Sequence, residues 1–302
     1  MRIVAALGGN ALLQRGEPPD AGTQQGHIVK AVAALAPLAR EHELVITHGN
    51  GPQVGLLALE SARNPALSQP YPFDVLGAQT QGMIGYWLAQ ALQNALPGRE
   101  VACLVSRTLV RADDPAFGAP AKFVGPVYDR EQAAELAARQ GWTMRPDGPA
   151  WRRVVPSPEP AELLDLPVIR RLAADGVIVI CAGGGGVPVT RRPGGLQGAE
   201  AVVDKDLTAA LLARDLGAGS LLLLTDVPAV QEGYGTPRAR PIGRISAARL
   251  RAMGFAAGSM GPKVEAACRF AEATGNIAAI GQLEDAADLA AGTAGTQVSL
   301  AC

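Results

Sequence analysis

The chain lacks the features that mark several large classes of protein. Its 302 residues contain no apolar run of the roughly 18–20 residues that a bilayer-spanning helix needs. The apolar N-terminal stretch ends at Gly8-Gly9, which is too short for a signal peptide and favours a buried first strand. The formal net charge is −1, so no basic surplus can neutralise the phosphates of a nucleic acid. We therefore expect a cytoplasmic protein with neither a membrane nor a nucleic-acid partner.

Cysteine is also scarce. The four cysteines are Cys103, Cys181, Cys268 and Cys302, and no two of them form a CxxC pair. Zinc sites and disulfides are therefore not expected, and small buried apolar side chains are the better interpretation of the first three. Apolar residues make up 48% of the chain and charged residues 18%, which indicates a folded globular protein.

Lysine is rare. The chain has 27 basic residues, but only four are lysines: Lys30, Lys122, Lys205 and Lys263. Where arginine is used almost everywhere, a lysine indicates a position that needs a compact, mobile point charge able to follow a phosphoryl group. Lys30 lies in a helix-like stretch, and we expect it to be a solvated surface residue. The other three are candidates for phosphate contacts.

Apolar, β-branched runs alternate with helical patterns along the chain. The runs 177–180 and 221–224 are apolar throughout, as expected of strands that are covered on both faces. This alternation predicts a three-layer α/β/α sandwich around a mainly parallel sheet. Strands are expected at 2–7, 43–47, 100–105, 176–181, 220–225 and 276–280, and helices at about 23–41, 51–64, 75–96, 160–175, 204–217 and 259–274.

The stretch from about 111 to 160 breaks the alternation. It is rich in proline and glycine, contains Trp142 and Trp151, and is too long for an ordinary connection. We interpret it as an inserted subdomain or lid with a short helix near 130–139. The alternative is a plain disordered loop.

Glycine clusters follow three of the expected strands. Ligands of open α/β sheets bind beyond the carboxyl ends of the strands, where glycine lets backbone N–H groups approach an anion. Any one cluster could be turn chemistry alone, but three at one edge of a sheet favour an anion site. The candidate residues are Gly8, Gly9, Asn10, Gly49, Asn50, Gly51, Gly183, Gly184 and Gly185.

Two of the lysines begin helical patterns. Lys205 follows Asp204, a plausible N-cap, and Lys263 follows Pro262 in another first turn. A helix N-terminus disfavours a cation, so either lysine could simply be solvated. The same conflict in two places suggests a bound phosphate, which both the helix and the lysine would attract. Asp206 could orient the lysines, help to hold Mg²⁺, or merely stabilise the first turn.

Other features limit the chemistry. Thr225-Asp226-Val227 ends a strand where a nucleotide could bind, although an exposed turn is the simpler interpretation. His48 is expected to be a hydrogen-bonding scaffold residue rather than a base. The chain has no Walker A loop, GxGxxG fingerprint, HRD or DFG set, HExxH or GxSxG. A kinase with this sequence belongs to neither the P-loop nor the protein-kinase type.

Together these segments resemble the amino acid kinase superfamily and, within it, the carbamate kinases. The glycine clusters and Lys205-Asp206 are signals of the superfamily. The insert around Lys122, the segment Trp151–Pro158 and the segment 259–267 are specific to carbamate kinases. The resemblance covers essentially the whole length, in the segments 8–12, 47–55, 80–86, 151–158, 183–189, 200–206, 224–228 and 256–267.

The resemblance implies reversible phosphoryl transfer, in which ADP and carbamoyl phosphate give ATP and carbamate. It implies Mg²⁺ held mainly by the nucleotide phosphates, with no metal site of the protein's own. It also implies a single 1–302 domain with an open eight-stranded sheet, a protruding subdomain at 111–160, and a homodimer. Within the domain, residues 1–200 would bind the acid and phosphate, and residues 201–302 the nucleotide.

The resemblance also implies roles for single residues. Lys122, Lys205 and Lys263 would neutralise the transferring phosphoryl group, with Asp206 organising the last two. Backbone amides of Gly8, Gly9, Gly49, Gly51 and Gly184 would hold carbamate and phosphate. The ADP site would be lined by Thr225, Asp226, Val227, Tyr234 and Met260, together with Lys205 and Lys263. The chain departs from the family pattern at Phe123, Val127 and Ala229.

Three other functions remain open on the sequence. The acceptor could be glutamate, acetylglutamate, aspartate or UMP, although the Lys122 and Trp151 segments count against this. A non-catalytic sensor of carbamoyl phosphate or nucleotide is a second alternative, and the retained lysines argue against it. A dinucleotide-dependent oxidoreductase is a third, disfavoured by the missing fingerprint.

Overall fold

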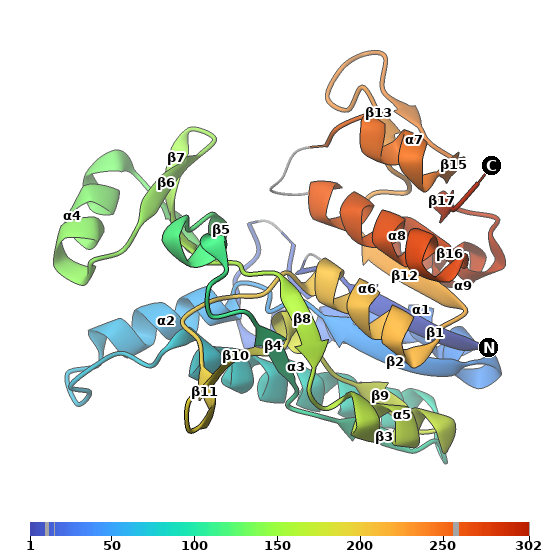
Figure 1. Ribbon diagram of the computed structural model, residues 1–302, viewed down its shortest axis with the longest axis horizontal. Coiled ribbons are helices and arrows are strands. Elements are labelled where there is room, and N and C mark those ends of the chain that lie inside the picture. Colours follow the sequence, from blue (N-terminus) through green and yellow to red (C-terminus); the bar gives the residue numbers. More distant parts are fainter. Residues whose placement is uncertain (10–11, 15, 256–259, 302) are drawn as a thin grey trace.

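The computed structural model describes residues 1–9, 12–14, 16–255 and 260–301. Its centre is an eight-stranded sheet with strand order β15-β17-β16-β12-β1-β2-β9-β3, in which only the β16–β17 pair is antiparallel. Figure 1 shows this sheet with its helices and a smaller unit projecting from one side.

The strands and helices have the following bounds. The strands are β1 Arg2–Leu7, β2 Glu43–His48, β3 Val101–Cys103, β4 Arg107–Val110, β5 Lys122–Tyr128, β6 Met144–Asp147, β7 Ala150–Val155, β8 Pro160–Leu163, β9 Ile178–Ile180, β10 Val187–Arg192, β11 Gly195–Gly198, β12 Ser220–Thr225, β13 Gln231–Glu232, β14 Arg240–Pro241, β15 Arg244–Ser246, β16 Ile277–Gln282 and β17 Thr296–Ser299. The helices are α1 Ala21–Glu41, α2 Gln53–Arg63, α3 Phe73–Ala95, α4 Arg130–Gln140, α5 Leu166–Ala174, α6 Lys205–Leu216, α7 Ala247–Ala252, α8 Met260–Thr274 and α9 Ala286–Ala291, with short 3₁₀ turns at η2 Pro115–Gly118, η3 Gly183–Gly185 and η4 Leu283–Asp285.

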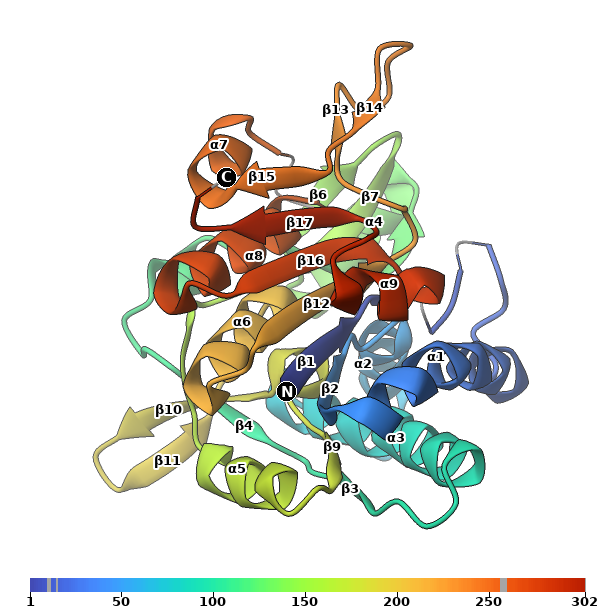
Figure 2. The same ribbon diagram turned by 90° about the vertical axis from the view of Figure 1, so that its right-hand side faces the viewer.

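The central strands are buried on both faces, and alternate residues along each strand belong to two separate hydrophobic cores, one on each face of the sheet. In β1, Val4 and Ala6 join the core beneath α5, α6 and α8, whereas Ile3 and Ala5 join the core beneath α1, α3 and α9. Figure 2 shows the two helix layers on opposite sides of the sheet. The predicted three-layer α/β/α architecture with a mainly parallel eight-stranded sheet is therefore confirmed.

A second, four-stranded sheet was not expected. It has the order β11-β10-β4-β8 and joins segments that are far apart in the sequence. The helix predicted over 160–175 is wrong at its start, because Pro160–Leu163 pairs with β4 as strand β8, and α5 begins only at Leu166. Pro167, near the start of α5, suits a first turn, where no N–H is required of it.

Strands β5, β6 and β7, with α4, form a separate unit that we call the β5–β7 unit (residues 122–155). Its three-stranded antiparallel sheet has the order β5-β7-β6, and the unit projects at the left of Figure 1. The short helix predicted near 130–139 is present as α4, where Asp129 and Gln132 form a reciprocal capping box.

Several smaller expectations can also be compared with the structure. Cys181 and Cys268 are buried and Cys103 is half-buried, as apolar side chains would be, while Cys302 lies outside the described residues. Lys30 is exposed. Within the part of the chain that the structure describes, no helix is both long enough and apolar enough to cross a membrane.

Candidate active site

The glycine clusters meet at the carboxyl edge of the main sheet. Strands β12, β1 and β2 are parallel neighbours, and Leu7 at the end of β1 lies opposite both His48 and Leu224. The loops that follow these strands therefore start side by side. They are packed closely, because a methyl group added at Gly49 would lie 3.3 Å from the nitrogen of Gly9 and 3.5 Å from Cδ of Lys205.

The loop after β9 completes this edge. Gly184 has a φ of 63°, and a Cβ there would lie only 2.0 Å from Oδ1 of Asn50, so glycine is required twice over. Asn50 is held in place by the hydroxyl of Thr80, which donates to its Oδ1 at 3.0 Å. The carbonyl of Gly185 accepts from the Thr208 hydroxyl at 3.1 Å, which ties this loop to α6.

Not every predicted amide is available for a ligand. The N–H of Gly8 donates to the Leu224 carbonyl at 3.0 Å, and the N–H of Gly49 donates to the Leu7 carbonyl at 3.0 Å. These two groups continue the sheet ladder beyond its formal ends. The predicted anion-binding residue Asn10 lies outside the described residues.

Two of the three singled-out lysines share one carboxylate. Lys205 donates to Oδ1 of Asp206 at 2.5 Å, and Lys263 donates to its Oδ2 at 3.0 Å. The lysine side chains are each 13% exposed and that of Asp206 is 5% exposed. Asp206 thus brings together the first turns of α6 and α8, which lie 57 residues apart in sequence.

The third lysine reaches the same helix from the β5–β7 unit. Lys122, at the start of β5, donates to Oδ2 of Asp204 at 2.5 Å. The other oxygen of Asp204 accepts the N–H groups of Asp206 at 2.9 Å and Leu207 at 3.2 Å. Asp204 is therefore the N-cap of α6, as predicted, and also the partner of Lys122.

The charges of this cluster depend on one another. Burial acts to raise the pKa of Asp206, but attraction to Lys205 and Lys263 outweighs it and holds that pKa below its ordinary value. For Asp204, burial is likewise outweighed by Lys122, so its pKa is also lowered. Burial lowers the pKa of Lys205, against the opposing attraction of Asp206. Both carboxylates are therefore ionised at neutral pH.

The β5–β7 unit is packed onto the main body beside this cluster. The guanidinium of Arg153 on β7 lies 4.7 Å from the ring centre of Phe73 on α3 and 4.1 Å from that of Trp142 within the unit. Such stacking is attractive and is strengthened by burial. The backbones of α2 and β5 touch, since a Cβ on Gly55 would lie 2.0 Å from Cα of Gly125. An apolar cluster that includes Val124, Val155 and Leu76 fills the rest of the contact.

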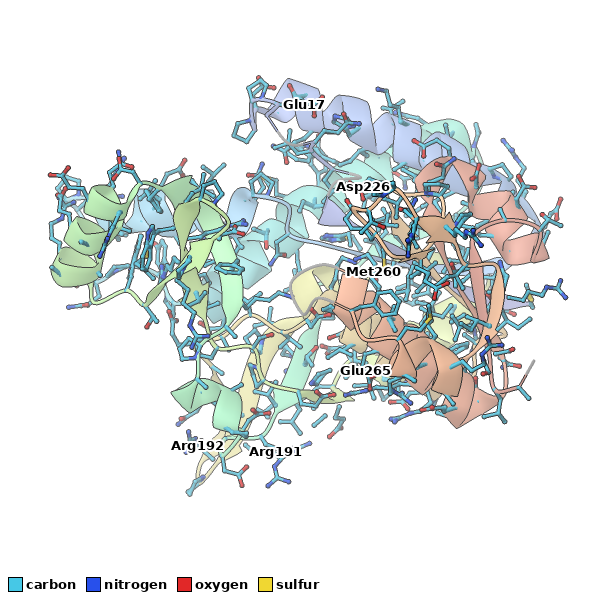
Figure 3. The ribbon with its side chains drawn as sticks, turned by 90° about the horizontal axis from the view of Figure 1, so that it is seen from above. Glu17, Arg191, Arg192, Asp226, Met260 and Glu265 are labelled. Atoms are coloured by element: carbon cyan, nitrogen blue, oxygen red, sulfur yellow. The ribbon has the colours of Figure 1, made fainter. Side chains whose placement is uncertain are left out.

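The residues predicted for the nucleotide lie on three segments. Thr225 ends β12, its hydroxyl donates to Asp226 at 3.1 Å, and Val227 follows half-buried. Figure 3 marks Asp226 and Met260, the first residue of α8. Tyr234 is 78% exposed in the loop of the β13–β14 hairpin, which projects from the sheet in Figure 2.

His48 is buried at the end of β2, and its Nδ1 is 2.8 Å from the Gly49 carbonyl oxygen. Burial lowers the pKa of His48 to about 4, so the ring is neutral at physiological pH. This agrees with the predicted scaffold role. Sequence reasoning missed the second role of Asp204 and the stacking of Arg153, because each depends on contact with a distant segment. Among the described residues, no group of three or more His, Cys, Asp or Glu side chains is placed to hold a metal ion.

Comparison with known proteins gives consistent results. The model of the amino acid kinase family matches residues 1–280. The carbamate kinase of Rhizobium meliloti (strain 1021) is 53% identical over 305 residues, which covers 99% of this chain and 93% of that protein. The carbamate kinase of Escherichia coli (strain K12) is 50% identical over 298 residues, with 99% of both chains covered. The structure of carbamate kinase from Giardia lamblia bound to AMP-PNP is 39% identical, with a TM-score of 0.90 and coverage of 99% of this chain and 98% of that one.

Proposed function

The chain belongs to the amino acid kinase family, and from this premise we propose that it is a carbamate kinase. It transfers a phosphoryl group reversibly between carbamoyl phosphate and ADP. The observation that carries this proposal is the convergence of three lysines, Lys205, Lys263 and Lys122, on Asp204 and Asp206 at the carboxyl edge of the sheet. The names of the similar proteins favour carbamate over an amino acid as the acceptor.

The proposed mechanism is direct in-line transfer. During transfer, the phosphoryl group carries negative charge on its equatorial oxygens. Positioned cations therefore lower the activation barrier of the transfer more than covalent chemistry could. We assign this charge neutralisation to Lys205 and Lys263, with Asp206 fixing the position of both ammonium groups. Lys122 contributes from the β5–β7 unit, which we propose acts as a lid belonging to an insert at about 111–160.

The acceptor needs no general base. Carbamate is already ionised, so its oxygen can attack without losing a proton. His48 could not serve as a proton carrier, because it is buried and hydrogen-bonded to Gly49, and its pKa of about 4 keeps it neutral.

The backbone supplies the remaining contacts in this proposal. Gly9, Gly51 and Gly184 are the better candidates for anion-binding amides, because the N–H groups of Gly8 and Gly49 already donate to strand carbonyls. We assign acid and phosphate binding to residues 1–200 and nucleotide binding to residues 201–302, where Thr225 ends β12 and Met260 begins α8, the helix that carries Lys263.

We propose that Mg²⁺ enters the site in complex with the phosphates of the nucleotide. Asp204 and Asp206, the acidic side chains at the cluster, are engaged by lysines, so they fit the role of ordering cations better than that of ligating one. When bound, the metal would neutralise nucleotide phosphate charge. A cytoplasmic location follows from the proposed dependence on the cellular ADP and ATP pools.

We also propose a homodimer. Strand β3 is an edge of the main sheet, and its residues are only half-buried. Next to it Val105 is 53% exposed, and on the adjacent α3 Tyr86 is 57% exposed. A half-buried, apolar edge strand such as β3 has unpaired backbone groups that can pair with a second copy of this chain. Analytical ultracentrifugation should give twice the chain mass for the native protein and a shift towards monomer for Tyr86→Glu.

The direct test of function is ATP formation from Mg-ADP and carbamoyl phosphate. Metal-dependent turnover that prefers carbamoyl phosphate to acetyl phosphate supports the proposal. Folded protein that binds ADP but forms no ATP would refute it and would favour another acid acceptor or a sensor.

A further inference from the structure

The ion pair between Lys122 and Asp204 is the polar contact that places the β5–β7 unit against the first turn of α6. The Asp204 side chain is 11% exposed and that of Lys122 is 32% exposed, so the pair lies at the rim of the cluster. The two carboxylate oxygens of Asp204 have different partners. Oδ1 caps α6 by accepting from Asp206 and Leu207, which leaves Oδ2 for the ammonium group alone.

The ion pair with Oδ2 of Asp204 restricts the motion of the Lys122 side chain. A lysine side chain is flexible, and fixing it costs rotamer entropy whenever it binds something. An ammonium group has three N–H donors, so one donor can stay on Asp204 while the others turn towards an incoming phosphoryl oxygen. Lys122 is thus ordered before any substrate arrives, in the neighbourhood of Lys205.

We propose that Asp204 is a positioning residue that holds Lys122 ready for carbamoyl phosphate, separately from its capping of α6. The inference rests on the proposed function of the chain and extends it to a residue beyond the three lysines and Asp206. It assigns the two aspartates on either side of Lys205 to different tasks. Asp206 orders the lysines of the main body, and Asp204 orders the lysine of the lid.

The test separates charge from capping. Asp204→Asn and Asp204→Ser each keep a side-chain oxygen that can cap α6, and each removes the charge that attracts Lys122. A matched control is Asp165→Asn, since Asp165 is also at an N-cap position, pairs with Arg107 at 2.7 Å, and lies outside the lysine cluster. The wild-type rate of ATP formation reports on the proposed function, and only the ratios between variants report on Asp204.

The expected result is a split between the two substrates. Asp204→Asn and Asp204→Ser should raise the KM for carbamoyl phosphate about tenfold, because Lys122 must now be ordered on binding. The KM for ADP should stay within about twofold, and kcat within about threefold, because bound carbamoyl phosphate itself orders the flexible, partly exposed Lys122 side chain once it is in the site. Asp165→Asn should match the wild type in both substrates.

The double variant Lys122→Ala/Asp204→Asn supplies the second readout. Once Lys122 is absent, losing the charge of Asp204 should cost no further activity, so the double variant should equal Lys122→Ala. A purely structural role would instead lower the melting temperature and add its full cost in the Lys122→Ala background. Additive losses, an unchanged or lower KM for carbamoyl phosphate, or an equal rise in the KM for ADP would overturn the proposal.

Discussion

Replacing Asp206 by asparagine should be among the most damaging single changes in this chain. The substitution keeps the size of the side chain but removes the charge that lies 2.5 Å from the Lys205 ammonium and 3.0 Å from that of Lys263. Both lysine side chains are only 13% exposed, so water cannot replace the lost carboxylate effectively. Removing one partner of a buried ion pair typically costs about 3–5 kcal/mol, and we expect a loss of this order in the free energy of unfolding.

The pH dependence gives an independent check of the same reasoning. The pKa of Asp206 is lower in the folded protein than its ordinary value of 3.8. The folded state then binds fewer protons than the unfolded state, so this group stabilises the protein above about pH 4 and loses that effect as the pH falls towards the folded pKa. The difference in unfolding free energy between the wild type and Asp206→Asn should therefore shrink below about pH 4.

An anion should partly replace the missing carboxylate. Asp206→Asn removes the carboxylate that Lys205 and Lys263 share, and a bound phosphate can supply the missing negative charge. We expect inorganic phosphate to raise the unfolding free energy of the variant more than that of the wild type, by mass action on the folded state. Turnover should nevertheless fall by about 10²–10⁴, because the two ammonium groups are no longer held in position.

The assay is urea unfolding followed by circular dichroism at pH 7 and at pH 3.5, with and without phosphate. Asp113→Asn serves as control, because its ion pair with Arg111 is largely exposed and should contribute almost nothing to the free energy of unfolding. If Asp206→Asn unfolds within about 1 kcal/mol of the wild type, with the same dependence on pH, the shared-carboxylate account of the cluster is wrong.

Three further predictions concern other parts of the site. Lys263→Ala should lower kcat by about 10²–10⁴ in the coupled ATP assay, since one of the cations that neutralises the transferring group is gone. Arg153→Met keeps the length of the side chain but loses its stacking on the aromatic rings at 4.7 and 4.1 Å, and should make the β5–β7 unit more sensitive to limited proteolysis. Gly55→Ala should undock the same unit and raise the KM for carbamoyl phosphate, because the added Cβ would lie 2.0 Å from Cα of Gly125. Gly82→Ala on α3 is the control, because its Cβ would meet no atom within 4 Å. This variant should stabilise the chain by about 0.5–1 kcal/mol.

Each of these has a clear contrary result. Near-normal turnover in Lys263→Ala would remove this lysine from the reaction. Equal proteolysis rates for Arg153→Met and the wild type would mean that the stacking contributes nothing to docking. A normal KM in Gly55→Ala would separate the docking of the unit from substrate binding.

The sequence predicted best those parts of the fold that are determined locally. The strands Arg2–Leu7 and Ser220–Thr225 were predicted with the correct bounds, because each is an apolar run that ends at a polar or glycine residue. The start of α6 was also correct, since Asp204 is both a favoured capping residue and placed just before the helical pattern. What failed was long-range pairing. Pro160–Leu163 forms a strand only because β4 lies beside it, and no local pattern reports that partner.

The candidate site shows the same division. Rarity and position in a first turn singled out Lys205 and Lys263, and the structure brings both onto Asp206. No such signal marked Arg153, which is one arginine among many and stacks on the ring of Phe73 from the distant helix α3 as well as on that of Trp142. The engagement of the Gly8 and Gly49 amides in the sheet could not be foreseen either, because a glycine after a strand can face a ligand or continue a ladder.

The carboxylates around Lys205 also affect the rate at which the protein associates with its substrates in solution. The formal charges of three lysines and two aspartates leave the cluster with a single net positive charge. A site this close to neutrality exerts little pull beyond about 10 Å at ordinary ionic strength. Substrate capture should therefore be governed by diffusion into a shaped site rather than by long-range steering, with an association rate that changes little between low and physiological salt. The same near-balance lets the anions of either side of the reaction leave, as a reversible enzyme requires.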